Sequence, residues 1–271
     1  MIVSQMENRA RKLRGDIISM MEDGGRGHLA SALSLVEILG VLYDEVLKYR
    51  SNEPRWPQRD RLILSKGHGC LALYAVLADK GFFDATELRR VCRADGILGG
   101  HPEFPKVPGV EASTGALGHG LSIGIGMALD ARYEKRDHKV VVIVGDGECN
   151  EGSIWEAALC AHKHGLDNLT VVVDYNKMQS YASTSQVLEL EPFVDKWKSF
   201  GFSVCEVDGH DAAALGQVFE ALPFSPERPN AVICHTTKGK GITFVENNLA
   251  WHHKSRLESD EISALYSALK G

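Results

Sequence analysis

Two short stretches carry side chains that could together bind a metal ion and a phosphate group. Asp146 lies in a Gly145-Asp146-Gly147 turn directly after an apolar run, and Asn176 follows the next apolar run thirty residues later. Mg²⁺ binds six oxygens at about 2.0–2.1 Å and usually completes its shell with phosphate oxygens and water. The Asp146 carboxylate, the Asn176 amide oxygen and a backbone carbonyl of the following turn, that of Met178, would supply three. Two diphosphate oxygens and one water would supply the rest.

The backbone around Asp146 also suits a phosphate. Gly145 and Gly147 allow a tight turn and a close approach of the backbone to phosphate oxygens. A helix is expected directly after this turn, and its N-terminus would add a partial positive charge of about half a unit.

Other metal and phosphate motifs fit less well. An EF-hand loop beginning at Asp146 needs Gly at its sixth position and Glu at its twelfth, but Glu151 and Ala157 stand there. No stretch matches the GxxxxGK(S/T) pattern of a P-loop. The stretch 118–124 approximates the GxGxxG dinucleotide fingerprint but is one residue too long. The plain alternative is a turn whose glycines serve only close packing. The presence of Asn176 after the next expected strand, thirty residues beyond Asp146, argues against it.

Four of the eleven histidines are flanked by glycines or loop breaks: His28, His68, His101 and His252. A single histidine is usually only a satisfied or solvated side chain. Binding groups nevertheless concentrate on loops held by a rigid scaffold, and imidazole moves protons near pH 7. His138, His162, His164 and His235 are expected to be structural or surface residues. His210 is expected to cap or pack the start of a helix.

The apolar runs predict the elements that position these residues. Strands are expected at 61–65, 140–144, 169–173, 203–207 and 231–234. Helices are expected at 6–24, 35–46, 71–77, 151–164, 189–200, 211–222 and 259–271, and a long loop at 94–115. Alternating strands and helices predict a mainly parallel sheet with right-handed crossovers, in a three-layer αβα domain spanning residues 1–271. Ligands bind at the carboxyl ends of such strands, so Asp146 and Asn176 should meet there.

Composition excludes several classes of protein. The net charge is -6 and no block of Lys and Arg resembles a nucleic-acid-binding surface. The six cysteines form no CxxC pair, which disfavours a zinc site and suits a reducing cytoplasm. No apolar stretch reaches the roughly 18 residues of a membrane span, and Met1–Glu7 does not resemble a signal peptide. A soluble cytoplasmic protein is therefore expected.

The stretch from Gly145 to Asn176 resembles the thiamine diphosphate motif shared by transketolases, dehydrogenase E1 components and related enzymes. The similarity to transketolases extends from about residue 5 to about residue 265, and it is strongest to the split form with a separate N-terminal subunit. The resemblance implies the diphosphate-binding (PP-type) domain of this family. It also implies thiamine diphosphate held by Mg²⁺, or by Ca²⁺ or Mn²⁺. The implied reaction moves a two-carbon ketol unit from a ketose, such as a sugar phosphate, to an aldose.

The resemblance assigns roles to residues whose surroundings match the family's motifs. Residues implied in substrate binding, proton transfer or linkage between cofactor sites are His28, His101, His252 and Glu151. Residues implied in cofactor binding are His68, Gly115, Leu117, Gly145, Asp146, Gly147, Glu148, Asn176 and Lys238. His253 stands where the family usually has Gly, which leaves open whether 252 or 253 is the active-site histidine. The stretches 30–31 and 180–184 also depart from the family pattern.

The resemblance covers only the first domain of a full transketolase. The domain that binds the aminopyrimidine is missing, together with its activating glutamate and the arginines that bind sugar phosphate. A separate pyrimidine-domain subunit is therefore expected, in an α2β2 assembly. One alternative is the α subunit of a 2-oxo acid dehydrogenase E1, against which the four histidines and the Thr-Lys-Gly-Lys-Gly loop at 237–241 argue. Another is a non-catalytic cofactor-binding subunit. The sugar stays open among pentose phosphates, sulfosugars and branched sugars.

Overall fold

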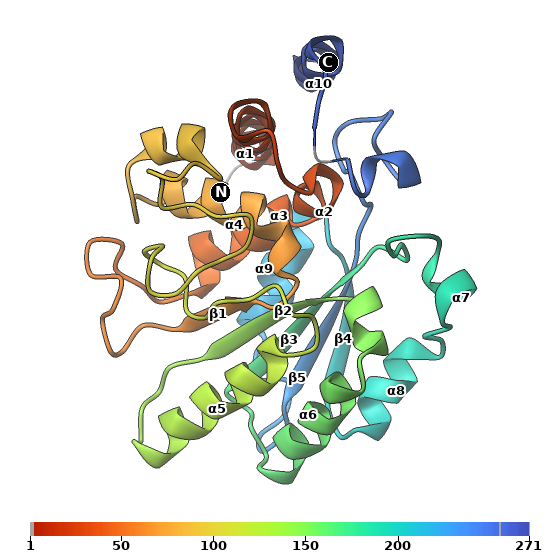
Figure 1. Cartoon of the computed structure of the whole chain (residues 1–271). Helices are drawn as coiled ribbons and strands as arrows, with labels where there is room; N and C mark the ends of the chain where they lie inside the picture. The colour runs from red at the N-terminus through yellow and green to blue at the C-terminus, as the bar shows by residue number, and fades with distance from the viewer. Residues whose placement is uncertain (1–2, 255, 271) are drawn as a thin grey trace.

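The computed structural model describes residues 3–254 and 256–270. Its centre is a five-stranded sheet in the order β1-β2-β3-β5-β4, and every neighbouring pair of strands is parallel (Figure 1). The strands are β1 (Arg61–Leu64), β2 (Val140–Gly145), β3 (Leu169–Tyr175), β4 (Ser203–Asp208) and β5 (Asn230–His235). Each lies within two residues of the range expected from its apolar run, so the predicted parallel sheet is confirmed.

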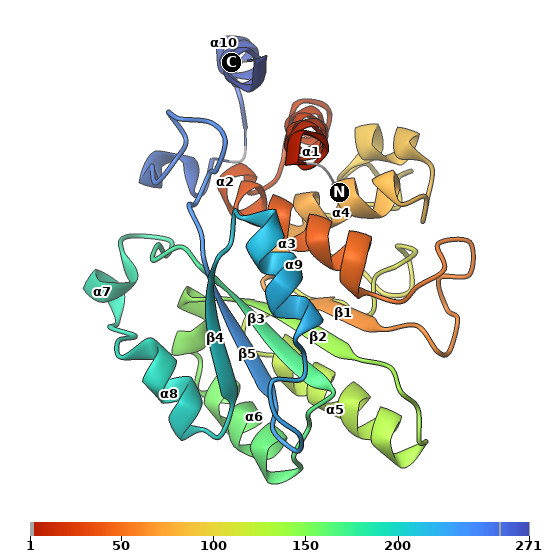
Figure 2. The ribbon, with the colours of Figure 1, turned by 180° about the vertical axis from the view of Figure 1, so that it is seen from behind.

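Alternate residues of the strands face two separate hydrophobic cores, which makes three layers. Val141 and Ile143 of β2 point into one core, and Val140, Val142 and Val144 point into the other. The first core is covered by α1 (Val3–Gly24), α2 (Leu29–Leu33), α3 (Val36–Val41), α4 (Cys70–Asp79) and α9 (Ala212–Glu220). The second is covered by α5 (Gly120–Tyr133), α6 (Gly152–Lys163) and α8 (Phe193–Ser199). Figures 1 and 2 show these two sets of helices on opposite faces of the sheet.

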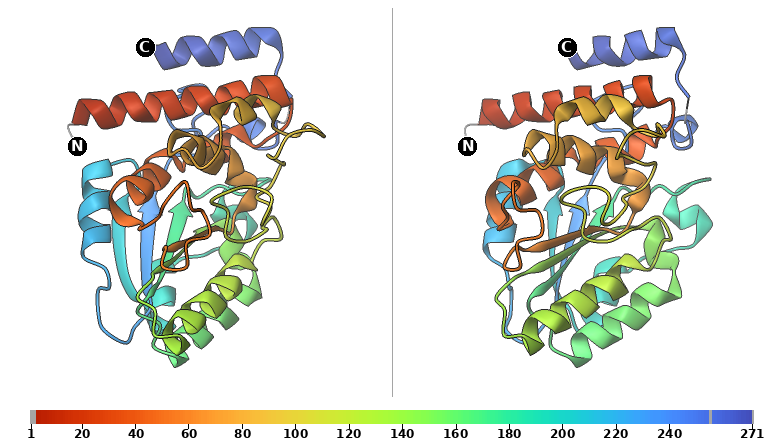
Figure 3. Two further views of the ribbon diagram at one scale, coloured as in Figure 1. Left: turned by 90° about the vertical axis from the view of Figure 1, so that its left-hand side faces the viewer. Right: turned by 60° about the vertical axis from the view of Figure 1, so that its left-hand side comes forward.

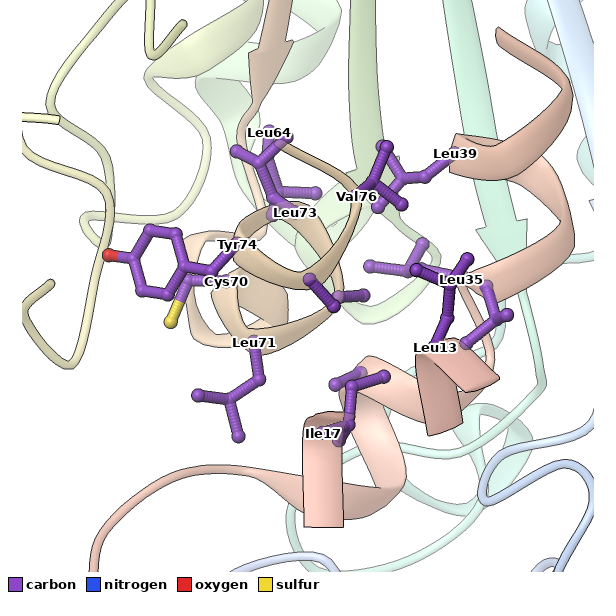
Figure 4. Packing of buried hydrophobic residues seen from close by; sticks show 14 of the residues in the cluster. Leu13, Ile17, Leu35, Leu39, Leu64, Cys70, Leu71, Leu73, Tyr74 and Val76 are labelled. Carbon is purple, nitrogen blue, oxygen red and sulfur yellow. The ribbon is translucent and has the colours of Figure 1, made fainter. Parts of the chain in front are cut away.

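Helix α4 lies at the centre of the first core. Its residues from Cys70 to Ala78 are all buried, as expected for a helix that is apolar on every side. In Figure 4 the side chains of α4 pack among Leu13 and Ile17 of α1, Leu39 of α3 and Leu64 of β1. This packing fixes the end of β1, from which the chain enters the stretch 65–69.

The remaining elements are short or peripheral. They are the π-helical turn η1 (Leu42–Val46), the 3-10 helices η2 (Gly67–Gly69), η3 (Ala85–Arg90), η4 (Gly147–Asn150) and η5 (Leu249–Trp251), and the α-helices α7 (Thr184–Val187) and α10 (Ser259–Lys270). Helix α10 runs antiparallel to α1 on the outside of the molecule (Figure 3). No helix among the described residues is long and apolar enough to cross a membrane.

Two expected helices differ from those observed. The single helix expected over 35–46 is observed as two consecutive elements, α3 and the π-helical turn η1. The helix expected over 189–200 begins only at Phe193, because Pro192 has no backbone N–H and precedes its first turn. The loop expected over 94–115 is confirmed, since this stretch contains no helix or strand.

The contact of α5 with the sheet yields a stability prediction. A Cβ atom at Gly124 would lie 2.4 Å from Cγ2 of Val142, whereas a Cβ atom at Gly126 would meet nothing within 4 Å. We expect Gly124→Ala to lower the free energy of unfolding by about 1–3 kcal/mol through overpacking. The matched control Gly126→Ala should raise it by about 0.5–1 kcal/mol, because alanine is the better helix former. Urea unfolding of both variants tests this, and equal effects would contradict the close packing of α5 on β2.

Candidate functional site

A cleft of about 420 Å³ opens at the carboxyl ends of the strands, where ligands bind in sheets of this kind. Lys66 follows β1, Asp146 follows β2, Asn176 follows β3 and Lys238 follows β5, and all four line the cleft. The other lining residues are His68, Leu117, Gly145, Gly147, Glu148, Asn150, Glu151, Met178, Gln179, Ser180, Val187, Leu188 and His252. The structure thus brings most of the residues singled out in the sequence to one place.

Asp146 and Asn176 meet because their strands are neighbours in register. Gly145 pairs with Asp174 across β2 and β3, so the next turns of both strands lie side by side. The buried Asp146 carboxylate accepts backbone hydrogen bonds from Gly147 at 2.6 Å and from Lys177 at 2.5 Å. Two backbone donors orient this carboxylate toward the turn that contains Asn176.

The turn after β3 provides two further oxygens. The Asn176 side-chain oxygen accepts a hydrogen bond from the Met178 backbone N–H at 3.1 Å, and the Met178 carbonyl accepts one from the Lys238 ammonium at 3.3 Å. Carboxylate, amide and carbonyl oxygens are the donor types that Mg²⁺, Ca²⁺ and Mn²⁺ accept. The donor set therefore fits a hard divalent cation.

The electrostatics of Asp146 also favour a cation. Its burial and the nearby charge of Asp174 raise the pKa of the Asp146 carboxyl to about 7. No Lys, Arg or His of the described chain forms a salt bridge with it. Asp174 is different, because its side chain pairs with Lys66 and accepts hydrogen bonds from Ser34 and Thr236. Burial alone would raise the pKa of Asp174, but the Lys66 charge and these hydrogen bonds lower it.

Lys238 presents the opposite situation. Its side chain is 3% exposed, and among the described residues no carboxylate lies within 4.0 Å of its ammonium group. Burial and the charge of Lys66 lower the pKa of Lys238 to about 8. A buried cation without a direct salt bridge suits an anionic ligand such as a diphosphate. The cleft therefore contains an acidic group and a basic group, neither of which forms a salt bridge with a described residue.

Glu148 lines the cleft, but its carboxylate is occupied by protein donors. It accepts hydrogen bonds from the Ser65 hydroxyl, from the Gly118 N–H at 2.8 Å and from the Gly145 N–H at 3.1 Å. These bonds connect the ends of β1 and β2 to the loop before α5. Through these bonds Glu148 holds together the loops that border the cleft.

Three of the four histidines gather beside the cleft. The rings of His28 and His68 lie 5.6 Å apart, and the His28 Nδ1 atom is 3.4 Å from the His252 carbonyl. Burial lowers the pKa of His28 and His68, and it lowers that of His252 to about 3. These imidazoles are therefore neutral at pH 7. The Nδ1 atom of His252 is buried without a hydrogen-bond partner among the described residues, and His252 lines the cleft.

The histidine at 252, and not the one at 253, lines the cleft. His252 is 6% exposed, whereas His253 is exposed and its ring lies 6.0 Å from that of His28. His101 is also exposed, and a Cβ atom at Gly115 would lie 2.9 Å from its ring, so the loop needs glycine there. Glu151 is exposed at the rim of the cleft.

Several cleft residues were missed in the sequence. Lys66 follows a strand directly, so the rule that located Asp146 could have found it. Gln179 has a buried side-chain nitrogen without a partner among the described residues, and no sequence signal marked it. Of the two roles expected for His210, the cap of α9 is Asp211 instead. His210 packs beside the start of this helix and joins Glu37 to the backbone N–H of Thr237.

Comparison with known proteins identifies the family. The family described as transketolase, thiamine diphosphate binding domain, matches residues 2–270. One subunit of the apulose-4-phosphate transketolase of Phocaeicola vulgatus is 38% identical, over 93% of this chain and 90% of that protein. The 6-deoxy-6-sulfo-D-fructose transketolase subunit SqwG of a Clostridium species is also 38% identical, over 93% and 92%.

Solved structures and full-length relatives extend the comparison. Transketolase of Campylobacter jejuni superimposes with a TM-score of 0.92 at 29% identity, over 100% of this chain and 43% of that chain. Human transketolase is 35% identical over 98% of this chain and 42% of its own length. The chain thus spans about two fifths of full-length transketolases but nearly all of the relatives that are single subunits. It belongs to the transketolase family, as the thiamine-diphosphate-binding N-terminal subunit of a split transketolase-like enzyme.

Proposed function

We propose that this chain, together with a separate pyrimidine-domain subunit, transfers a two-carbon ketol unit from a ketose donor to an aldose acceptor. One observation carries the proposal. Asp146 and Lys238 are buried in the same cleft and neither forms a salt bridge with a described residue, as suits a site for a metal ion and a diphosphate. In this proposal residues 1–271 act as one diphosphate-binding domain.

The oxygens of the turns after β2 and β3 would hold the metal. We assign Mg²⁺ to the Asp146 carboxylate, the Asn176 amide oxygen and the Met178 carbonyl, and Ca²⁺ or Mn²⁺ would accept the same donors. Lys238 would face the diphosphate, with Gly145 and Gly147 at the turn beside it. Thiamine diphosphate, when bound, supplies the nucleophilic carbon and electron sink needed to break a carbon–carbon bond beside a carbonyl.

The histidines would bind and relay protons for the sugar. His28, His68 and His252 are neutral at pH 7, so each ring can donate one hydrogen bond and accept another from a hydroxyl group. Bond cleavage and formation in a ketose require protons to leave and return to hydroxyl oxygens, which suits such groups. His101 lies on the exposed loop next to Gly115, where a donor sugar could reach it.

A second chain would complete the active site. Relatives of about the same length are named as single subunits of transketolases, which supports a partner that carries the pyrimidine-binding domain. We propose an α2β2 assembly in which Glu151, exposed at the cleft rim, contributes to contacts between cofactor sites.

The six free cysteines fit a protein that works in a reducing cytoplasm.

The named relatives suggest the class of substrate. The name of one specifies apulose 4-phosphate, and that of another specifies 6-deoxy-6-sulfo-D-fructose. We therefore propose a ketose with a phosphate or sulfonate group, and pentose phosphates belong to the same class. Among the described residues the cleft holds neither an arginine nor a second lysine without a partner, which fits anion recognition of the sugar by the other subunit.

A donor screen with the assembled enzyme tests this function. With thiamine diphosphate and Mg²⁺, we expect two-carbon transfer from ketose phosphates or sulfoketoses, and no decarboxylation of pyruvate. His28→Ala and His101→Ala should each lower kcat/KM by about 10²-fold or more, because general acid–base groups contribute on that scale. His164→Ala, which changes an exposed histidine at the far end of α6, should leave kcat/KM unchanged. Pyruvate decarboxylation, or full activity in His28→Ala and His101→Ala, would contradict the proposal.

The raised pKa of Asp146 predicts how stability depends on pH. Between the ordinary carboxyl value of 3.8 and about 7, the folded metal-free chain binds a proton that the unfolded chain lacks. This carboxyl therefore contributes stability that falls as pH rises through this range, while His28, His68 and His252, whose pKa values are lowered, contribute in the opposite sense. Asp146→Asn should remove only the carboxyl contribution, so its stability relative to the wild-type chain should rise by about 1–3 kcal/mol between pH 5.5 and pH 8.

Asp174→Asn is the matched control, because it leaves the buried Lys66 without its partner. It should destabilise the chain by about 3–5 kcal/mol. Chemical unfolding at pH 5.5 and pH 8 in the presence of a chelator measures all three proteins. A stability difference between the wild-type chain and Asp146→Asn that stays the same at pH 5.5 and pH 8 would contradict the raised pKa of this carboxyl.

A further inference from the structure

The turn that carries Lys238 is held from both sides. We call residues Thr236–Gly241 the Lys238 turn. Gly239 and Gly241 adopt φ values of +83° and +91°, which favour glycine. The Lys238 carbonyl accepts a hydrogen bond from the Asn247 N–H at 2.9 Å, and the Gly239 N–H donates one to the Ala30 carbonyl at 3.0 Å.

The side chains of His210, Glu37 and Arg14, which lie outside the cleft, form a continuous series of hydrogen bonds that begins and ends on the backbone of this turn. The Thr237 N–H donates to Nε2 of His210 at 2.8 Å, and Nδ1 of His210 lies 2.9 Å from Oε2 of Glu37. Oε1 of Glu37 pairs with the Arg14 guanidinium at 2.7 Å. Nε of Arg14 then donates to the Lys240 carbonyl at 2.8 Å. This series of hydrogen bonds therefore holds the backbone of the turn at residues 237 and 240, on either side of Lys238.

The protonation states in this chain follow from its geometry. Because Nε2 of His210 accepts from a backbone N–H, the ring proton sits on Nδ1 and donates to Glu37. Burial alone would raise the pKa of Glu37, but the hydrogen bond from His210 and the charge of Arg14 lower it, so its carboxylate is ionised. The side chains of Arg14, Glu37 and His210 are 7%, 12% and 10% exposed, so little water competes with these bonds.

We propose that Arg14, Glu37 and His210 are positioning residues that aim Lys238 at the anionic ligand of the cleft, although none of the three lines the cleft. The proposal rests on the proposed function, since it takes the ligand to be the diphosphate of thiamine diphosphate. Lys238 has four flexible bonds, and its ammonium has a single hydrogen bond to the described residues. A fixed backbone at residues 237 and 240 restricts where this long side chain begins, and preorganisation of this kind improves binding.

Two substitutions of His210 separate the two ends of its ring. Glutamine can place an acceptor near the position of Nε2 and keep the bond from Thr237. Asparagine can reach only the position of Nδ1, and so loses that bond. With saturating Mg²⁺, His210→Asn should weaken the Kd of the assembled enzyme for thiamine diphosphate about tenfold, the scale of one lost hydrogen bond, and His210→Gln by less than about threefold. Glu37→Gln should also weaken it about tenfold.

A double-mutant cycle with Lys238→Met decides whether the effect passes through Lys238. If it does, adding His210→Asn to Lys238→Met should change the Kd by less than about twofold. The matched control is His235→Asn, because the His235 side chain forms a similar 2.8 Å pair with Glu206 but is exposed and makes no hydrogen bond to the Lys238 turn, although its backbone directly precedes Thr236. Calorimetry gives each Kd, and thermal unfolding confirms that each variant is folded. If His210→Asn does not fold, the cycle is run with Glu37→Gln.

Each outcome decides the matter. Wild-type affinity in both His210→Asn and Glu37→Gln would overturn the positioning role while leaving the proposed function intact. An equal loss with and without Lys238→Met, or an equal loss in His210→Asn and His210→Gln, would also overturn it. A wild-type enzyme that takes up no thiamine diphosphate in the presence of Mg²⁺ would overturn the proposed function, and this inference with it.

Discussion

Asp146 and Lys238 are both buried at one edge of the sheet, and neither side chain forms a salt bridge with another described residue. A buried charge without a partner costs several kcal/mol, and a titratable group responds with a shifted pKa. The pKa of the acid rises to about 7 and that of the base falls to about 8, so each is close to losing its charge at neutral pH. In the proposed site, a metal ion facing the carboxylate and a diphosphate facing the ammonium group would stabilise both charges.

The parallel sheet makes this arrangement possible. Neighbouring strands end at the same edge, so turns from distant parts of the chain meet there without long excursions. Asp174 uses the same edge in the opposite way. Its charge is fully compensated by Lys66 and by two hydroxyl groups, and it ties the ends of β1, β3 and β5 together. The hydrogen-bonded network around Asp174 thus fixes the strand ends next to Asp146 and Lys238, which form no salt bridges with other described residues themselves.

The strands and the meeting of Asp146 with Asn176 could be predicted from the sequence. Continuous apolar runs mark strands that are buried on both faces, and a spacing of thirty residues matches one strand–helix–strand unit. The pairing of Lys66 with Asp174 could not be predicted, because it depends on the order of the strands in the sheet. His210 and Glu37 are 173 residues apart in the sequence. Their contact depends on how α3, which contains Glu37, packs against the start of α9, which follows His210, and the sequence does not show this. That His252 lines the cleft while His253 is exposed could not be predicted, because two adjacent histidines do not reveal their burial in sequence.

The residues that the resemblance singled out differ in their surroundings. Glu148 supports neighbouring loops through three hydrogen bonds. His252 lines the cleft and has a buried nitrogen without a partner among the described residues, and Gly115 makes room for the ring of His101. These features prepare one half of a site for its ligand, and the relatives named as single transketolase subunits imply that another chain supplies the other half.

Calorimetric titration of the assembled enzyme with thiamine diphosphate tests the central claim most directly. We predict uptake that requires Mg²⁺ and that weakens at least about a hundredfold in Asp146→Ala, because this carboxylate would carry the charge that holds the metal. Uptake of equal affinity in the presence of a chelator, or uptake that Asp146→Ala leaves intact, would contradict the account.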